Sequence, residues 1–528
     1  MKKSIDLIIK QGLIFDGKGG EPVVSDIAVK DGRILAVGIF SENEAETIIP
    51  AKGMAVAPGF IDSHAHSDFT LLADNRAEGK LCQGVTTEIN GNCGMSAAPL
   101  YGKAIERRED DLKELGINER WNSVKEYRSV IEKKGLALNA AMLIGHGNIR
   151  GSVLGYDNRE PSATELSRMK QLLDTSIQEG GIGFSTGLIY PPGIYSSTDE
   201  LAALAEVLKS YGLLYTSHMR SEGAALLESI QEVISISCAA GIKAHISHLK
   251  TAGEQNWHKS EAAIALIMAA REQGMEISCD RYPYIASSTD LDSLLPSWAF
   301  EGGNEEELQR LRSEEMRVMM RRELLEQTKN RIYWDRVIIS SVVSPAKAWM
   351  EGETIAKISE RLGCDEIEAV FTILLEEKLR VSAIFLSMSE DNLRKFLSLP
   401  FCSIGSDSSA RCFDGPTRRG MPHPRTFGTF PRFFGKYVRD EKLMPLTEAI
   451  RRATMLPAAI FGLKGRGQVK EGFSADIVIF DPDKLSDRAT FEDPFQKPAG
   501  VPYVLVNGSP AVWEGEPSGK FSGRMLTR

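Results

Sequence analysis

Two histidines separated by one residue, His64 and His66, end an apolar stretch that begins at Gly59. Side chains alternate between the two faces of an extended strand, so positions two apart point the same way. Two imidazoles on one face suit a divalent metal ion such as zinc. Phe60 and Ile61 indicate a buried strand, and the histidines are therefore expected where a barrel strand meets its loop, which is where barrel enzymes keep their catalytic residues.

Similar apolar, β-rich runs alternate with helical patterns along the middle of the chain. Eight such runs are expected, at residues 56–62, 84–89, 138–144, 181–185, 212–217, 242–247, 275–279 and 401–405. This number and this alternation predict a (β/α)8 TIM-like barrel. One helix is expected at 164–178, and another at 198–210 with Thr198 as its cap.

The runs are followed by residues whose side chains bind metals or transfer protons. These residues are His64, His66, Cys93, His218, His248 and Asp407. A barrel gathers the carboxyl ends of its strands in one ring, so these side chains are expected to converge on one site. Imidazole and thiolate ligands favour zinc, and the set is large enough for two ions.

The two ends of the chain are expected to form a second, smaller unit. Strand patterns with hairpin signals at Asp31-Gly32 and Asn507-Gly508 predict a small β-sandwich domain built from residues 1–57 and 464–528, which leaves 58–463 for the barrel. The interval between strands seven and eight exceeds one helix, and an insertion is expected at about 290–355. Helical stretches at 305–329 and 354–377 fall in this interval, where they form either a solvated packing face or a lid over the substrate.

Composition limits the classes of function. The chain has 528 residues, of which 42% are hydrophobic and 26% charged, with no apolar run of the roughly 18 residues that a membrane span needs. Asp6 and Lys10 interrupt the stretch that a secretory signal would need, and seven scattered cysteines are typical of reduced thiols, so a cytoplasmic location is expected. The net charge of −9, without a basic cluster, disfavours nucleic acid and favours a small-molecule partner. The number of subunits stays open, with a homo-oligomer among the alternatives.

Longer motifs carry a resemblance to a known family. They lie at 58–68, 84–94, 181–192, 216–220, 245–250, 280–289, 404–407, 421–425 and 428–432. In these motifs the chain resembles the amidohydrolase superfamily and, within it, the N-acyl-D-amino-acid deacylase (D-aminoacylase) family. Many superfamily members bridge two metals with a carboxylated lysine, but no lysine lies between Gly181 and Tyr195. Cys93 takes that place in the deacylase family.

The resemblance implies an activity and a set of roles. The activity is zinc-dependent hydrolysis of N-acyl-D-amino acids to a D-amino acid and a carboxylate. Cys93, His218 and His248 would hold a tight zinc, His64 and His66 a weaker second one, and Asp407 would carry the proton as general base and acid. The residues expected to bind the substrate are Arg425, Tyr282, Ser288, Lys250 and Tyr190.

Two other readings of the sequence stay open. One is a different amidohydrolase activity, on a cyclic amide such as a hydantoin or dihydropyrimidine, or on a dipeptide that contains a D-residue. The other is a non-catalytic scaffold that keeps the barrel.

In the loop 408–420, Arg411, Arg418 and Arg419 suggest an acidic or larger substrate. His245, three residues before His248, is expected to point away from the barrel interior.

Overall fold

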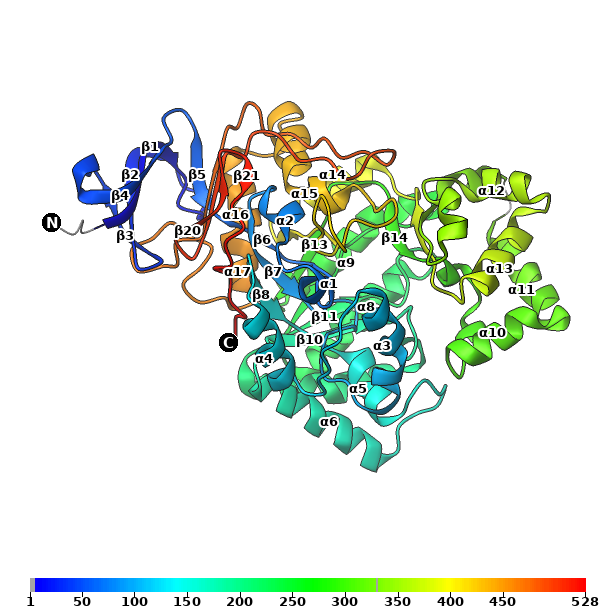
Figure 1. The fold of residues 1–528 in the computed structure, drawn as a ribbon. Helices are drawn as coiled ribbons and strands as arrows, with labels where there is room; N and C mark the ends of the chain where they lie inside the picture. The colour runs from blue at the N-terminus through cyan, green and yellow to red at the C-terminus, as the bar shows by residue number, and fades with distance from the viewer. Residues whose placement is uncertain (1–4, 329–330) are drawn as a thin grey trace.

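The computed structural model describes residues 5–328 and 331–528 (Figure 1). A central barrel carries a small β domain on one side and a helical insertion on the other. The expectations for residues 1–4, and for Lys329 at the end of the stretch 305–329, lie outside the described residues. Among the residues described, no helix is long and apolar enough to pass through a bilayer.

Eight parallel strand positions form the barrel, as the sequence predicts. They are β6 (Phe60–Asp62), β7 (Val85–Asn90), β8 (Asn139–Met142) with β9 (Ile144–Gly145), β10 (Gly183–Gly187), β11 (Leu214–His218), β12 (Lys243–Ile246), β13 (Ile277–Arg281) and β17 (Cys402–Ile404). The amide of Ser63 donates to the carbonyl of Ile404 at 3.2 Å, which closes the ring between its first and last strands. The expected (β/α)8 architecture is therefore confirmed.

The first expected run, 56–62, is in fact two strands that belong to two sheets. Its first half is β5 (Ala55–Pro58), which pairs with the small domain, and its second half is β6 of the barrel. Gly59 separates them, and a Cβ there would lie 2.2 Å from the Thr86 hydroxyl. The chain can therefore change sheets at this point only with a residue that has no side chain.

Helices surround the barrel, and the last of them contributes Ala458 to the cluster inside it. They are α1 (Thr70–Ala73), α2 (Glu78–Leu81), α3 (Gly102–Glu114), α4 (Val124–Lys134), α5 (His146–Val153), α6 (Ala163–Gln178), α7 (Thr198–Ala205), α8 (Leu226–Ala240), α9 (Ser260–Glu272), α14 (Glu390–Leu397), α15 (Arg425–Arg432), α16 (Leu446–Ala453) and α17 (Met455–Ile460). A capping box of Ser162 and Glu165 starts α6 near the expected residue. The cap of α7 is Ser197 and not Thr198, because the Ser197 side chain accepts from the Glu200 amide.

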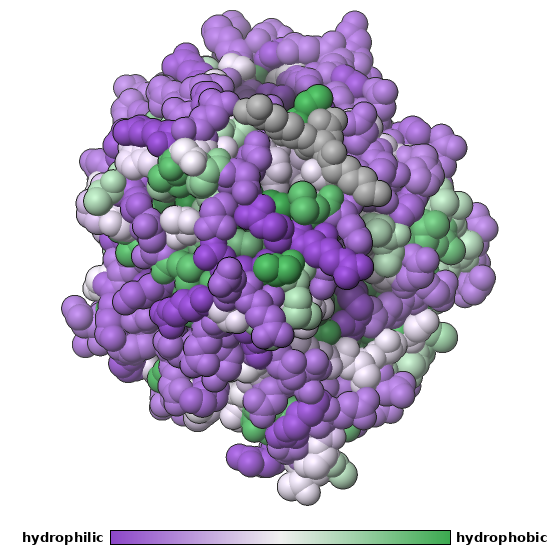
Figure 2. All heavy atoms as spheres, turned by 90° about the vertical axis from the view of Figure 1, so that its right-hand side faces the viewer, coloured by the Kyte–Doolittle hydropathy of each residue, from purple (hydrophilic) through white to green (hydrophobic). Residues whose placement is uncertain are grey.

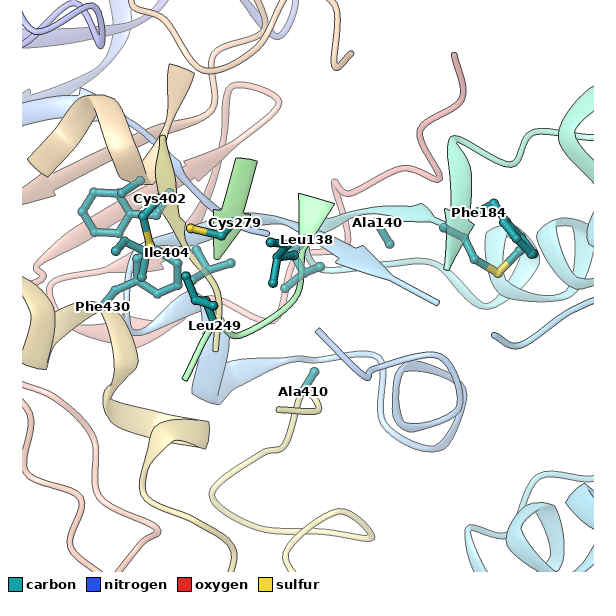
Figure 3. Close-up of a cluster of buried hydrophobic side chains, with 14 of the residues drawn as sticks. Leu138, Ala140, Phe184, Leu249, Cys279, Cys402, Ile404, Ala410 and Phe430 are labelled. Carbon is teal, nitrogen blue, oxygen red and sulfur yellow. The ribbon is translucent and has the colours of Figure 1, made fainter. Parts of the chain in front are cut away.

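The barrel wall has an apolar cluster on each face. Inside, Ile61, Ile89 and Leu143 pack against Phe461, which follows α17. Outside, Cys279, Cys402 and Ile404 of neighbouring strands lie with Phe430 of α15 (Figure 3). The alternation along each strand thus buries both faces, as expected for a parallel barrel wrapped by helices.

The small domain draws its strands from both chain ends. Its sheet has the order β21-β20-β19-β18-β5-β1-β2-β3, with β4 also paired to β1. Both hairpins turn as predicted, because Asp31-Gly32 and Asn507-Gly508 adopt the left-handed φ values that a tight two-residue turn requires. The strands are β1 (Ile5–Ile14), β2 (Val23–Lys30), β3 (Arg33–Gly38), β4 (Ala45–Pro50), β18 (Ile477–Phe480), β19 (Tyr503–Val506), β20 (Ser509–Trp513) and β21 (Glu516–Pro517).

The insertion is larger than the expected 290–355. Its three-stranded sheet has the order β14-β16-β15, formed by Ser287–Asp290, Ser382–Phe385 and Val337–Ser341. Its helices are α10 (Asn304–Arg312), α11 (Glu314–Gln327), α12 (Ile355–Leu362) and α13 (Glu366–Glu376). The expected limits are wrong because the middle strand, β16, follows α13, and because both halves share one hydrophobic core. The outer face of this side is mainly hydrophilic, with isolated hydrophobic groups (Figure 2).

Phe60 joins the barrel to the small domain. Its ring stacks on Phe430 and Phe434, with centroids 5.4 and 4.8 Å away, and it contacts Phe480 of β18 at 5.9 Å. Phe60→Ala is expected to lower the free energy of unfolding by about 3–5 kcal/mol, because it leaves a cavity at this junction. Urea unfolding measures the loss, and Phe521→Ala, at an exposed ring, serves as control. Equal effects of the two variants would contradict this role of Phe60.

Candidate metal centre

The strand ends bring the predicted ligands together in two groups. The ligand atoms of the first group lie within 4.8 Å of one another, and so do those of the second. Cys93 belongs to both groups, which makes its sulfur the shared point of the site. Among the residues described, the first group is His64, His66, Cys93 and Asp407, and the second is Cys93, His218 and His248.

Three residues of the site have a left-handed backbone. The φ angles of Cys93, His248 and Asp407 are +54°, +36° and +51°. Residues other than glycine seldom adopt such angles, and the strain is typical of functional sites. Each of these residues follows a barrel strand, and the reversed φ interrupts the regular two-face alternation of that strand.

The distances from the Cys93 sulfur to two imidazoles are those expected between ligands of a zinc ion. The Cys93 sulfur lies 3.3 Å from Nε2 of His64 and 3.5 Å from Nε2 of His248. Two ligands of a tetrahedral zinc, with bonds of about 2.3 Å to sulfur and about 2.0 Å to nitrogen, stand about 3.5 Å apart. His218 is buried, yet neither ring nitrogen has a hydrogen-bond partner in the described part of the chain. A buried imidazole without a hydrogen bond, beside a thiol, is available as a metal ligand.

The surroundings of Cys93 favour its thiolate. Burial by itself raises the pKa of a thiol, but the imidazoles of His64, His248 and His66 hold the pKa of Cys93 well below its ordinary value. The thiolate is the form that binds metal. The donor set of this centre therefore fits zinc, as the sequence predicts.

Asp407 lies at the edge of the first group. One carboxylate oxygen is 3.2 Å from Nε2 of His66 and 3.5 Å from Nε2 of His64, and the other is 2.9 Å from a guanidinium nitrogen of Arg425. Burial alone would raise the pKa of Asp407, but Arg425 and the imidazoles hold it well below its ordinary value. The group is therefore an ionised carboxylate beside the ligands.

Arg425 and Tyr282 form one side of the site. The guanidinium carbon of Arg425 lies 4.6 Å from the centre of the Tyr282 ring. The Tyr282 hydroxyl and Nε of Arg425 are buried and have no hydrogen-bond partner among the residues that the structure describes. Ser288 contacts Arg425 through its backbone carbonyl, at 3.4 Å.

Tyr190 and Lys250 lie beside the second group of ligands. The Tyr190 ring packs edge-on against His218 at 5.1 Å, and its hydroxyl is 2.9 Å from Thr289 of the insertion. Nζ of Lys250 is 2.8 Å from Nδ1 of His248. All five residues expected to bind the substrate thus lie around the ligands or against one another.

Two carboxylates that the sequence analysis missed support the histidines. Asp280 contacts Nδ1 of His64 at 3.1 Å and accepts from the His248 amide at 3.0 Å. Glu222 lies 2.8 Å from Nδ1 of His248 and pairs with Lys250. Carboxylates in this position fix the orientation of metal-binding imidazoles. The seventh expected run ended at 279, one residue before Asp280, and Glu222 follows His218 by four residues in a loop without a recognisable motif.

The expectation for His245 is wrong. Its Nε2 lies 2.8 Å from Asp280, and its ring packs against Phe461 inside the barrel. Two-residue alternation fails here because β12 ends at Ile246 and the chain turns before His248.

The three arginines of the loop 408–420 contact groups of the protein itself. Arg419 donates to the backbone carbonyl of Glu114, Arg411 donates to the carbonyl of Arg419, and Arg418 lies over the ring of Phe495. These contacts give no support to the expected preference for acidic substrates.

A closed barrel with two groups of metal ligands and a carboxylate at one mouth has the architecture of a metal-dependent hydrolase. The model of the amidohydrolase family matches residues 47–328 and 325–512. N-acyl-D-glutamate deacylase from Alcaligenes xylosoxydans xylosoxydans is 34% identical and aligns with 100% of this chain and 98% of its own. D-aminoacylase from the same organism is 33% identical, and the match covers 99% of this chain and 98% of that protein.

A solved structure agrees with these relatives. The crystal structure of N-acyl-D-glutamate deacylase from Bordetella bronchiseptica, complexed with zinc and a phosphonate inhibitor, is 34% identical and has a TM-score of 0.84. The match covers 99% of this chain and 100% of that one. The chain therefore belongs to the amidohydrolase family and, within it, to the N-acyl-D-amino-acid deacylases.

Glu222→Gln is expected to weaken zinc binding by about 10- to 100-fold, because the amide holds His248 less firmly than the carboxylate does. Competition with a chromogenic chelator measures the affinity. Glu206→Gln is the control, since Glu206 is an exposed residue that pairs with Lys170. An unchanged affinity in Glu222→Gln would show that the carboxylate does not support the metal.

Proposed function

We propose that this protein is a zinc-dependent hydrolase that splits N-acyl-D-amino acids into a D-amino acid and a carboxylate. The observation that carries the proposal is the Cys93 sulfur shared by two ligand groups, with the Asp407 carboxylate beside them. The relatives that match the whole chain act as deacylases of this kind by name. The choice of the D-series rests on these relatives.

We assign the tight zinc to Cys93, His218 and His248, and a second, weaker zinc to His64 and His66. The chemistry that zinc supplies when bound is Lewis-acid activation of water and of the amide carbonyl. Glu222 and Asp280 keep the imidazoles of His248 and His64 oriented through their Nδ1 atoms. That leaves the Nε2 atoms of both rings directed at Cys93.

Asp407 is the proton carrier in this proposal. Its carboxylate is ionised and therefore ready to accept a proton from the attacking water. The same oxygen can then deliver the proton to the amine nitrogen as the amide bond breaks. Its contacts with His66 and His64 keep it within reach of the ligand groups.

Arg425 binds the substrate carboxylate, with Lys250 and Tyr282 beside it. A guanidinium makes paired, charge-assisted hydrogen bonds to a carboxylate. Nε of Arg425 and the Tyr282 hydroxyl are buried without a hydrogen-bond partner among the described residues, which supports this role. Ser288 and Tyr190 border the pocket, and Tyr190 ties it to the insertion through Thr289.

We place the enzyme in the cytoplasm. All seven of its cysteines, each in the described part of the chain, are free thiols, and Cys93 must stay reduced to bind metal.

Zinc-loaded wild type is expected to hydrolyse N-acetyl-D-amino acids and to leave the N-acetyl-L series intact. Asp407→Asn should lower kcat by about 10²- to 10⁴-fold, because it removes the proton carrier. A coupled assay for the free amino acid measures the rates, and metal analysis confirms that the variant keeps its zinc.

The substrates tested also include a hydantoin, a dihydropyrimidine and a dipeptide with a D-residue at its carboxyl terminus. Turnover of one of these alone would replace the proposal with another amidohydrolase activity. No turnover of any substrate by the zinc-loaded protein would favour the non-catalytic scaffold.

Arg425→Gln is expected to lower kcat/KM for an N-acetyl-D-amino acid by about 100-fold or more, because a desolvated carboxylate loses its charged partner. The matched substrate is the corresponding N-acetyl-D-amino acid amide, which has no carboxylate. Because Arg425 also contacts Asp407, the variant can lose activity on both substrates. The measurement is therefore the ratio of the loss of kcat/KM on the acid to the loss on the amide. Equal losses on both substrates would exclude carboxylate binding by Arg425.

A further inference from the structure

Asp407 lies in a turn that needs outside support. Its φ of +51° is unfavourable for a residue with a side chain. Its own amide donates to the carbonyl of His64 at 2.8 Å. Strained backbone of this kind persists only where the surrounding structure holds it, so the neighbours of Asp407 decide where its carboxylate points.

A buried polar cluster holds the residues on both sides of Asp407. One carboxylate oxygen of Asp62 accepts from the Ser406 amide at 2.8 Å, and the other accepts from the Ser406 hydroxyl at 2.6 Å. Nζ of Lys80 donates to the Ser406 hydroxyl at 2.7 Å and to the Ser408 carbonyl at 3.2 Å. The turn is thus fastened immediately before and immediately after Asp407.

The cluster lies behind the metal centre and not within it. Asp62 and Glu88 alternate along their strands with Ile61 and Ile89, which face the barrel interior. The two carboxyl groups therefore face outward, where Lys80 of α2 contacts them at 2.6 and 3.0 Å. All three side chains are fully buried.

Buried charges of this kind need a reason. Removing charged groups from water is costly, and a buried ion pair contributes little net stability compared with well-packed apolar side chains. Burial raises the pKa of Glu88, and Lys80 contacts the carboxyl groups of both Glu88 and Asp62. The same Asp62 oxygen that binds the Ser406 amide also accepts from the His64 amide at 3.2 Å. Asp62 thus links the chain after the first barrel strand, at His64, to the chain after the last barrel strand, at Ser406, which directly precedes Asp407.

We propose that Lys80 and Asp62 are positioning residues for Asp407, which they hold through Ser406 and Ser408 in the orientation that proton transfer requires. This inference rests on the proposed function, because it assumes that Asp407 carries the proton. Displacement of a catalytic group by about 1 Å can cost about 100-fold in rate. Loss of the cluster should therefore reduce turnover and leave metal and substrate binding intact.

Two variants test the proposal. Ser406→Ala removes the hydroxyl that bonds to both Lys80 and Asp62 and leaves both charges in place, whereas Lys80→Met removes the cation. Both are expected to lower kcat for N-acetyl-D-amino acids about 10- to 100-fold, with KM and zinc content within two-fold of wild type. Ser237→Ala is the matched control, since Ser237 is a buried serine of α8 that donates to the Ile242 carbonyl. Its kcat should stay within two-fold of wild type.

A double-mutant cycle separates positioning from general stability. If Ser406 acts through Asp407, Ser406→Ala should not slow the residual activity of Asp407→Asn any further. The proposal is overturned if Ser406→Ala keeps its kcat, if its activity falls only in proportion to its zinc, or if it slows both backgrounds equally. Should Lys80→Met not fold, Ser406→Ala still decides. An inactive wild type would contradict the proposed function, whereas an active wild type with an unaffected Ser406→Ala would contradict only the positioning role.

Discussion

The contact on which the rest of this structure depends is that of the buried Cys93 thiolate with the surrounding imidazoles. Its sulfur is buried and lies 3.3 Å from Nε2 of His64 and 3.5 Å from Nε2 of His248. Groups of such polarity are costly to bury unless each finds a partner of opposite character. Asp280 and Glu222 supply that partner for the outer nitrogens of the rings, and a metal ion would supply it for the inner ones. Each buried polar group of this site has its partner only when all of them are in place. This explains why residues from strands distant in sequence lie so close together.

The backbone around Cys93 leaves little room for adjustment. Gly91 and Gly94 flank it with φ of +73° each, and a Cβ on Gly91 would lie 2.1 Å from the Leu143 carbonyl oxygen. A Cβ on Gly94 would meet the amide of Gly187 at 2.6 Å. The loop is therefore packed against the ends of two neighbouring strands, and the left-handed turn at Cys93 follows from that packing. Rigid supports of this kind are what a precise ligand geometry requires.

Much of the fold follows from local patterns, whereas the support of the site depends on tertiary contacts. The barrel strands could be predicted because each is an apolar run that ends in a ligand or a turn residue, and the hairpin at Asp31-Gly32 because its turn needs left-handed residues. Asp280 and Glu222 could not be assigned, since only the fold brings them to the histidines. His245 was misjudged because alternation holds within a strand and fails where the strand ends. The insertion was drawn too short because its middle strand returns after two helices, and no local signal marks that return.

In the proposed function, the metal ligands and part of the substrate-binding surface come from different parts of the chain. The ligands and Asp407 belong to the barrel, whose wall is packed on both faces and tolerates little change. The opposite side of the candidate site is shared with the insertion, through Thr289 against Tyr190 and the Ser288 carbonyl against Arg425. The insertion has a hydrophobic core of its own, so its surface toward the candidate site can vary without disturbing the proposed metal ligands. Differences in substrate side chain among related deacylases are therefore expected to map to this boundary, while the ring of strand ends keeps the hydrolytic step the same.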